Sequence, residues 1–257
     1  MKEPARLRLT VAGAAPAWAR GPGRPSSSYL VELGAQALLL DLGQGSLGSL
    51  WAFRDPSTLE GIVVSHMHPD HHVDLVPLRH LLRYGMGTPR RVPLWAPQLL
   101  RERYDAFMGE PDFLGAAFDG GEVRPGTFLV GPFRVEARPV LHSLNSHAYR
   151  VSITADATAP GLVYSGDCAS WRDLVPLVQP GDTLLSEAFW GVEESDPGAM
   201  HMTADEAARV GVEGGAARLI LTHIGEEHDP RAALVAAQAR FPGEVQLAVP
   251  GLVVEVR

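Results

Sequence analysis

A short segment of the chain is rich in side chains that can bind a metal ion. Residues 65–72 read Ser-His-Met-His-Pro-Asp-His-His and directly follow a short apolar run. In an extended turn His66 and His68 point to the same side, and Asp70 with the following His71 can face a second point close by. Neutral imidazoles together with a carboxylate suit a divalent transition metal, zinc first. The segment therefore predicts a metal site at the end of a buried strand rather than a histidine-rich surface turn.

Three further residues of ligand type each stand after another apolar run. They are the first suitable side chains beyond the predicted strands 133–141, 161–165 and 218–222, namely His142, Asp167 and His223. A sheet whose successive strands end at one edge delivers side chains to a single site along that edge. Any one of the three could be a hydrogen-bonded loop residue, but their combination with the histidine-rich segment indicates one metal centre.

The elements that must position these side chains follow from the pattern of apolar runs. The predicted strands cover residues 7–12, 28–33, 37–42, 61–65, 92–95, 133–141, 148–154, 161–165, 183–186, 218–222 and 252–256. The predicted helices cover residues 45–53, 71–84, 97–108, 171–178, 204–213 and 231–240. Hairpin-like pairs of strands mixed with single helices indicate an α/β fold of the layered α+β kind, with sheets in the core and helices outside. No stretch resembles an interdomain linker or a repeat, so we expect a single domain over residues 1–257.

The composition and charge of the chain argue against several classes of protein. Of its 257 residues 46% are hydrophobic and 20% are charged, which is typical of a globular chain rather than a disordered one. No apolar run approaches the roughly 18 residues of a membrane-spanning helix, so we expect no membrane partner. The 22 Lys and Arg residues against 30 Asp and Glu residues leave a net charge of -8. This acidic balance argues against broad binding of nucleic acids through their phosphates.

The N-terminal stretch and the single cysteine bear on the cellular compartment. Lys2, Arg6 and Arg8 precede a modestly apolar stretch that ends in Ala-Trp-Ala at residues 17–19 and superficially resembles a signal peptide. The stretch lacks a strong hydrophobic block, so we interpret it as a first strand followed by a loop. Cys168 is the only cysteine and cannot form an intramolecular disulfide. A reducing cytoplasm is therefore the expected compartment.

Several other residues have a competing functional interpretation. Residues 43–48 match the Gly-x-Gly-x-x-Gly pattern of dinucleotide-binding turns, but Asp41 just before them would repel a pyrophosphate, so we expect a turn into a helix. Cys168 follows Asp167 along the chain, so its side chain should point away from the site and form a buried neutral thiol. Three histidines close to the motifs are expected at the rim rather than among the ligands: His72, His147 and His228.

The motifs resemble those of a metallo-β-lactamase-fold hydrolase, and more narrowly those of the short form of the ribonuclease Z branch. The resemblance rests on Asp41, the run from His66 to His71, His142, Asp167, Glu187-Ala188, His201-Met202-Thr203-Ala204 and Leu221-Thr222-His223. It implies an αββα sandwich with two zinc ions at one edge. By the same resemblance one ion is bound by His66, His68 and His142, the other by Asp70, His71 and His223, and Asp167 bridges them. Short members of the family often form homodimers, which we expect here as well.

The types of ligand also bear on the metal and its role. Related diiron electron-transfer proteins of this fold carry a carboxylate at the position of His68, whereas an imidazole there favours zinc, with manganese as an alternative, and hydrolysis. A structural zinc site is usually closed by four ligands rich in cysteine. This set of histidines and aspartates leaves room for water, which favours a catalytic centre over a non-catalytic metal-binding module. Asp41, a carboxylate at a strand end, is expected to orient a ligand histidine rather than to bind metal.

The candidate catalytic residues are Asp70, His201 and Glu187. His201 precedes a Thr-x-x-Glu capping box at residues 203–206, which would begin the next helix and point the histidine toward the site. The resemblance implies that this histidine contacts phosphate or protonates the leaving group, although Met202 replaces the small hydroxyl residue that usually follows it. Asp70 would bind one metal and orient the attacking hydroxide, while Glu187 would orient neighbouring groups.

These roles predict a dinuclear zinc-dependent hydrolase. Two divalent ions can share a bridging hydroxide that acts near neutral pH, and their charge can stabilise an in-line attack on phosphorus. We therefore expect a phosphodiesterase that acts on a small cyclic phosphate or nucleotide. Processing of transfer RNA 3′ ends is the alternative that the ribonuclease Z resemblance implies, yet the chain has no basic, Gly/Pro-tipped arm between His142 and Asp167. The same hydroxide can attack carbonyl carbon, so hydrolysis of an ester, lactone or thioester stays open.

Overall fold

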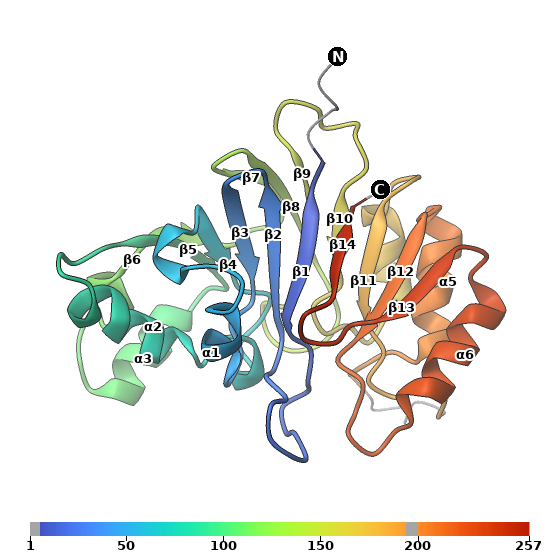
Figure 1. Cartoon of the computed structure of the whole chain (residues 1–257), viewed down its shortest axis with the longest axis horizontal. Helices are drawn as coiled ribbons and strands as arrows, with labels where there is room; N and C mark the ends of the chain where they lie inside the picture. The colour runs from blue at the N-terminus through green and yellow to red at the C-terminus, as the bar shows by residue number, and fades with distance from the viewer. Residues whose placement is uncertain (1–5, 194–199, 257) are drawn as a thin grey trace.

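Two sheets face each other across the middle of the molecule (Figure 1). This computed structural model describes residues 6–193 and 200–256. The first sheet contains, from edge to edge, β14 (Val253–Glu255), β1 (Arg8–Gly13), β2 (Ser28–Leu33), β3 (Gln36–Leu40), β4 (Gly61–Val63), β5 (Val92–Ala96) and β6 (Phe118–Glu122). The second sheet contains β13 (Glu244–Leu247), β12 (Arg218–Thr222), β11 (Thr183–Glu187), β10 (Leu162–Tyr164), β9 (His147–Ile153), β8 (Phe133–Pro139) and β7 (Gly126–Val130).

Helices cover the outer faces of both sheets. Beside the first sheet lie α1 (Ser46–Leu50), α2 (Leu75–His80) and α3 (Leu100–Met108), and beside the second lie α4 (Trp171–Leu174), α5 (Ala204–Gly214) and α6 (Pro230–Arg240). Short helical turns complete the structure: η1 (Pro56–Thr58), η2 (Pro69–His71), η3 (Leu81–Gly85), η4 (Leu114–Ala116) and η5 (Val175–Leu177). The order of layers is therefore helix, sheet, sheet, helix.

Separate apolar clusters between the layers explain why the sheets and helices stack in this order. In β3, Leu38 packs between the two sheets, whereas Leu39 packs against the helices outside the first sheet. In β11, Leu185 packs between the sheets and Leu184 packs against the helices outside the second. Successive side chains of a strand point to opposite faces, so a strand buried on both sides reads as a continuous apolar run. The predicted αββα sandwich is confirmed.

Parallel pairing brings the carboxyl ends of several strands to one edge of the sandwich. In the first sheet β3, β4 and β5 run parallel to one another. In the second sheet β10, β11, β12 and β13 do the same. The histidine-rich segment follows β4, Asp167 follows β10 and His223 follows β12. The two sheets thus deliver these residues to a common edge from both sides of the core.

Three strands were not predicted from the sequence, namely β6, β7 and β13. Each lies at an edge of its sheet. Because an edge strand has a neighbour on one side alone and stays partly open to water, its apolar pattern is incomplete. In β6 only Phe118 is buried, and Gly120 and Gly121 further weaken the pattern of a strand.

The predicted helix over residues 71–84 is wrong at both ends. Asp70 and His71 lie in the 3₁₀ turn η2, α2 begins four residues after His71, and a π-helical turn, η3, follows it. The side chain of His71 is bound to Asp41 at the end of β3, and His72 has a φ of -152°, outside the helical range. The contacts that hold the histidine-rich segment therefore take precedence over its helical pattern.

Within the N-terminal stretch that resembles a signal peptide, Arg8–Gly13 form β1 and a loop follows, as predicted. Among the described residues no helix is both long enough and apolar enough to cross a membrane. The predicted domain over residues 1–257 includes residues 1–5, 194–199 and 257, which lie outside the described part of the chain.

Candidate metal centre

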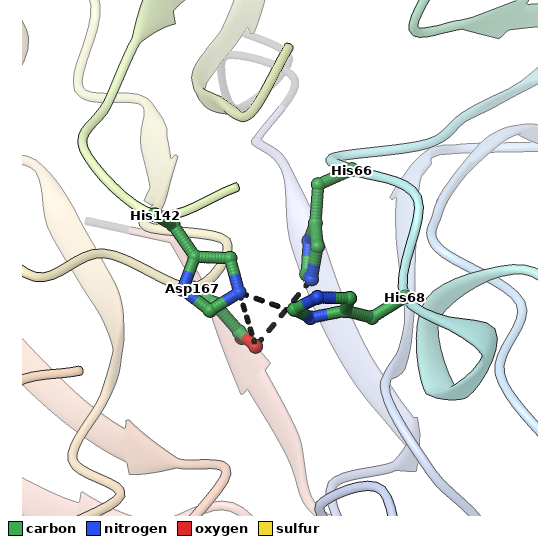
Figure 2. Close-up of side chains that lie close together, drawn as sticks. All are labelled: His66, His68, His142 and Asp167. Atoms are coloured by element: carbon green, nitrogen blue, oxygen red, sulfur yellow. Dashed lines mark hydrogen bonds and ion pairs between the residues drawn. The ribbon is translucent and has the colours of Figure 1, made fainter. Parts of the chain in front are cut away.

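The histidines and aspartates predicted as ligands meet at the edge where the parallel strands end. Figure 2 shows His66 and His68 approaching from one side and His142 and Asp167 from the other. The possible ligand atoms of these four residues lie within 4.8 Å of one another. Nε2 of His142 lies 3.0 Å from Nδ1 of His68, and Oδ2 of Asp167 lies 3.5 Å from Nε2 of His66. All four side chains therefore face one small volume.

A second group of possible ligand atoms adjoins the first. It consists of Asp70, His71 and His223, whose ligand atoms also lie within 4.8 Å of one another. Oδ2 of Asp70 lies 3.1 Å from Nε2 of His223 and 3.5 Å from Nε2 of His71. These three residues come from the turn after β4 and from the end of β12, so this group too joins the two sheets.

Asp167 contacts both groups. Its Oδ2 atom lies 3.5 Å from Nε2 of His66 in the first group and 3.6 Å from Nε2 of His223 in the second. Its Oδ1 atom lies 3.3 Å from Nε2 of His71. A carboxylate in this position has one oxygen available toward each group, which is the arrangement expected of a bridging ligand.

Several buried polar atoms of the centre have no hydrogen-bond partner in the described part of the chain. They include Nε2 of His66, Nε2 of His71, Oδ1 of Asp70 and Oδ1 of Asp167. A buried polar atom without a partner is costly, and native proteins rarely leave several of them together. Here the unpartnered atoms are imidazole nitrogens and carboxylate oxygens, the donors that bind divalent metal ions. The residues present thus fit a bound divalent metal.

Asp41 holds two of the histidines in orientation, as the sequence predicted for a ligand histidine. Its Oδ2 atom lies 2.7 Å from Nδ1 of His71 and also accepts from the hydroxyls of Ser65 and Tyr164, each at 2.7 Å. Its Oδ1 atom accepts from the backbone N–H of Ser65 at 2.6 Å. The hydroxyl of Ser65 also lies 3.0 Å from Nδ1 of His66. With Nδ1 engaged in this way, Nε2 of each histidine is left to face the centre.

Ser65 and Tyr164 are contributors that the sequence analysis missed. Ser65 is the first residue of the histidine-rich segment and Tyr164 is the last residue of β10, yet a buried hydroxyl has many structural uses and gives no signal of its own. The contact between Tyr164 and Asp41 joins residues 123 positions apart. Only the packing of one sheet on the other brings this hydroxyl to the carboxylate.

His201 lies at the side of the centre, next to Glu187. The predicted capping box is confirmed, since Thr203 and Glu206 each bind the backbone N–H of the other. Nδ1 of His201 lies 3.0 Å from Oε1 of Glu187 and 4.0 Å from Oδ2 of Asp167. Burial would lower the pKa of His201, but the negative charge and hydrogen bond of Glu187 outweigh it and raise the pKa to about 9.

Glu187 also ties the histidine to the chain beside Asp167. Its Oε1 atom accepts from the backbone N–H of Cys168 at 2.9 Å, and its Oε2 atom accepts from that of Phe189 at 3.0 Å. The carboxylate is fully buried. One side chain therefore fixes the position of His201 relative to Asp167, and we expect it to act by orienting that histidine.

The remaining residues with a competing interpretation take structural positions. Cys168 is buried, its thiol donates to the carbonyl oxygen of Ser170, and burial raises the pKa of the thiol. Glycines 43 and 45 form the turn into α1. None of three histidines near the motifs belongs to the groups of clustered ligand atoms: His72, His147 and His228. His201, in contrast, does form a further group with Asp167 and His223.

Comparison with known proteins places these observations in a family. A family model described as the beta-lactamase superfamily domain matches residues 38–224. An uncharacterized protein of Mycobacterium leprae is 32% identical over 95% of this chain and 87% of its own length. The probable metallo-hydrolase YhfI of Bacillus subtilis is 27% identical over 90% of this chain and 92% of its own.

A ribonuclease Z is also among the relatives. The enzyme of Myxococcus xanthus is 28% identical over 97% of this chain and 98% of its own length, in an alignment of 301 positions. Since this chain has 257 residues, the ribonuclease carries insertions that this chain lacks. Among solved structures, that of YhfI from Bacillus subtilis matches with a TM-score of 0.86 and 25% identity, over 97% of this chain and 99% of the other. The short form of human tRNase Z matches with a TM-score of 0.76 and 20% identity, over the same shares.

Proposed function

The chain belongs to the β-lactamase superfamily and is a metallo-β-lactamase-fold hydrolase, and we propose that it is a dinuclear zinc-dependent phosphodiesterase acting on a small cyclic phosphate or nucleotide. One observation carries the proposal. The carboxylate of Asp167 lies between two groups of converging donor atoms, and His201 adjoins the same carboxylate. Manganese is the alternative metal, because the same histidines and aspartates also suit it.

The proposal assigns the residues of the two groups as ligands. His66, His68 and His142 would hold one ion, Asp70, His71 and His223 the other, and Asp167 both. When bound, the ions would supply positive charge that stabilises a transition state at phosphorus and that makes water more acidic. Every ligand but His68 is buried, so the charges of the centre act with little screening by solvent.

The chain's own residues would then position the substrate and move protons. Oδ1 of Asp70 has no hydrogen-bond partner among the described residues and can accept from an attacking water. His201 shares the Nδ1 proton with Glu187, which leaves Nε2 as the atom that can donate to the departing alkoxide. Glu187 stabilises the protonated imidazole and keeps it beside Asp167. These roles suit the cleavage of a phosphodiester, whose leaving alkoxide needs a proton.

The size of the expected substrate follows from what the chain lacks relative to the ribonuclease Z of Myxococcus xanthus. The segment between His142 and Asp167 consists of the antiparallel strands β9 and β10 and their connections. No insertion stands there that could form an arm for transfer RNA. Transfer RNA 3′ processing is the second candidate function, favoured by the match to that ribonuclease. Hydrolysis of an ester, lactone or thioester would use the same metal ligands, so only an assay with different substrates distinguishes it from phosphodiester hydrolysis.

Metal analysis together with a panel of substrates tests the proposal. The panel contains bis(p-nitrophenyl) phosphate, 2′,3′- and 3′,5′-cyclic nucleotides, a precursor transfer RNA and simple esters and lactones. Wild type is compared with His66→Ala and His201→Ala, with His80→Ala on the exposed face of α2 as the control. We expect two ions per chain and turnover of the cyclic phosphates that falls in the first two variants and not in the third. If only the precursor transfer RNA, or only the esters and lactones, were hydrolysed, the assignment as a phosphodiesterase for small substrates would be wrong.

Three further expectations belong to the same proposal. We propose that the chain folds as one domain, forms a homodimer and works in the cytoplasm. The homodimer rests on the resemblance to short family members, and the compartment rests on the single cysteine. Light scattering on the purified protein measures the mass in solution directly, and a mass of one chain would exclude the dimer.

A further inference from the structure

The loop between β1 and β2 carries a tryptophan that the proposed chemistry does not use. The loop extends below the two sheets in Figure 1. Its start is fixed against the metal centre, because the backbone N–H of His223 donates to the carbonyl oxygen of Ala14 at 3.2 Å. Further along, Nε2 of Gln44 donates to the carbonyl oxygen of Ala17 at 3.3 Å. Trp18, the next residue, thus follows two anchored positions of the loop, one of which is bonded to a candidate ligand.

A row of rings connects Trp18 to the catalytic histidine. The indole meets the ring of Phe189 edge to face, with ring centroids 5.9 Å apart and planes at 77°. Phe189 stacks on His201, with centroids 4.5 Å apart and planes at 22°. The same phenylalanine lies 6.0 Å from the ring of His223. One ring, that of Phe189, therefore separates Trp18 from the residue proposed to protonate the leaving group.

The indole of Trp18 is half exposed although it belongs to a well-anchored loop. Its exposed fraction is 48%, whereas Phe189 beneath it is 7% exposed. A T-shaped contact with a single ring covers at most one face of the indole, so at least one face is free of Phe189. A large ring held in place with a free face is a surface on which a second planar group can stack.

Exposed apolar side chains also adjoin the candidate ligand His142. Leu141 and Leu144 flank the ligand His142 in sequence and are both exposed. The carbonyl oxygen of Met200, another exposed apolar residue, accepts from Nδ1 of His142 at 2.6 Å. A charged centre with exposed apolar groups near it suits a small substrate that joins a phosphate to a planar, uncharged part.

We propose that Trp18 is a specificity-determining residue that stacks on the nucleobase of a nucleotide whose phosphate lies at the metal centre. The inference rests on the proposed function and narrows its substrate class from small cyclic phosphates to those that carry a base. Stacking on an aromatic side chain tolerates different bases, because every base has a π-face. Trp18 thus selects for the presence of a base and not for its identity.

The test compares a substrate with a base and one without. Adenosine 3′,5′-cyclic phosphate and glycerol 1,2-cyclic phosphate are offered to wild type, Trp18→Leu and Trp18→Phe. Leucine keeps an apolar contact on Phe189 but cannot stack, whereas phenylalanine keeps an aromatic face. Trp51→Leu is the matched control, since Trp51 has a similar exposed fraction of 45% and stands at the end of α1.

The expected result is a selective rise in KM. Trp18→Leu raises the KM for the adenosine substrate about 10-fold or more, as loss of base stacking does in other proteins. It leaves kcat for that substrate, and both KM and kcat for the glycerol substrate, unchanged. Trp18→Phe restores most of the loss, and Trp51→Leu has no effect. Equal KM values for wild type and Trp18→Leu on the adenosine substrate overturn the inference while the phosphodiesterase assignment stands.

A binding measurement separates this inference from the proposed function. Adenosine 5′-monophosphate is titrated against wild type and Trp18→Phe, and the quenching of tryptophan fluorescence is recorded. Quenching that disappears in the variant supports stacking on Trp18 even if no cyclic phosphate is hydrolysed. The same quenching in both proteins, or none in either, overturns the role of Trp18 whatever the enzyme hydrolyses.

Discussion

Two clusters of buried charged side chains lie at opposite ends of the parallel strands of the second sheet. At the carboxyl ends lies the candidate metal centre. At the amino end of β11, Arg150 and Asp182 pair through two hydrogen bonds of 2.7 and 2.9 Å. Asp182 also accepts from the backbone N–H groups of Gly161 and Gln179.

The two clusters differ in how many of their polar atoms have hydrogen-bond partners within the chain. Both carboxylate oxygens of Asp182 have partners, and of the Arg150 nitrogens only Nη1 has none. In the metal centre, atoms on at least four side chains lack partners and point at one another. A cluster whose polar atoms have partners within the chain needs no group from outside, whereas one with several unpartnered atoms indicates that a bound group completes it. Burial and charge alone do not distinguish a functional site from a structural one.

Removal of the metal gives the largest expected effect on activity. Chelation or His66→Ala should lower kcat by about 1,000-fold or more, since loss of one group that stabilises transition-state charge already costs about 100- to 1,000-fold. The far-ultraviolet circular dichroism should stay that of the folded protein, because the apolar clusters between the layers do not depend on the ion. Restoring zinc or manganese to the chelated protein should restore turnover. Loss of the folded spectrum on chelation would show that the metal centre is needed for folding. The two clusters would then not differ in the functional and structural roles inferred above.

Breaking the Arg150–Asp182 pair should lower stability and leave activity unchanged, the opposite of metal removal. Asp182→Ala leaves the guanidinium of Arg150 buried without its partner, which typically costs about 3–5 kcal/mol. For a chain of this length that corresponds to a fall in Tm of about 6–20 °C. Thermal unfolding measures the change, and kcat of the folded variant at low temperature should match wild type.

A double variant sharpens the same comparison. Replacing both Arg150 and Asp182 with leucine removes the buried charges together and should recover much of the lost stability. If the double variant is as unstable as Asp182→Ala, the backbone contacts of Asp182 dominate, and the charge pair is not what stabilises this end of the sheet.

A glycine pair tests how closely the metal centre depends on its backbone. A Cβ on Gly43 would stand 1.9 Å from the carbonyl oxygen of Asp70, whereas one on Gly48 would have nothing within 4 Å. Gly43→Ala should therefore push the histidine-rich segment out of place and lower kcat by about 100-fold, the effect of a displacement near 1 Å. Gly48→Ala, inside α1, should stabilise the protein by about 0.5–1 kcal/mol and leave activity unchanged. Equal activity in the two variants would mean that the segment tolerates displacement.

The structure also gives the glycines of the Gly-x-Gly-x-x-Gly pattern a role in packing. Its first glycine, Gly43, is needed for the close approach of Asp70, and Gly45 has a φ of +74° in the turn into α1. The pattern is explained by the packing of the turn against the metal-binding segment. A motif of this length is short enough to arise from such local needs.

The residues predicted as ligands share a feature that makes them visible in sequence. Each of His66, Asp167 and His223 follows a strand that is buried on both faces, so a polar residue at its end stands out against an apolar run. Sheets in the core with helices outside were predictable for the same reason, whereas the αββα order was implied by the family resemblance. Edge strands such as β6 lack that background and were missed.

Contacts between the two sheets could not be predicted from the sequence. The hydroxyl of Tyr164 reaches Asp41 only because β10 and β3 lie in different sheets that pack together. Trp18 gave no signal for function, since its relation to Phe189 depends on where the loop after β1 lies relative to β11. Local patterns thus indicate the candidate metal ligands, whereas the residues that orient these ligands depend on tertiary structure.

The smallest expected effect comes from the capping box that begins α5, beside the metal centre. Thr203→Ala removes the hydroxyl that accepts from the N–H of Glu206 and should lower the free energy of unfolding by about 1 kcal/mol. His201, two residues before the cap, keeps its contact with Glu187, so metal content should be unchanged and kcat should fall only slightly. Chemical denaturation and single-turnover kinetics measure the two effects, and Thr203→Ser should restore both. A large loss of kcat without loss of stability would show that the cap, and not Glu187, holds the histidine at the metal centre.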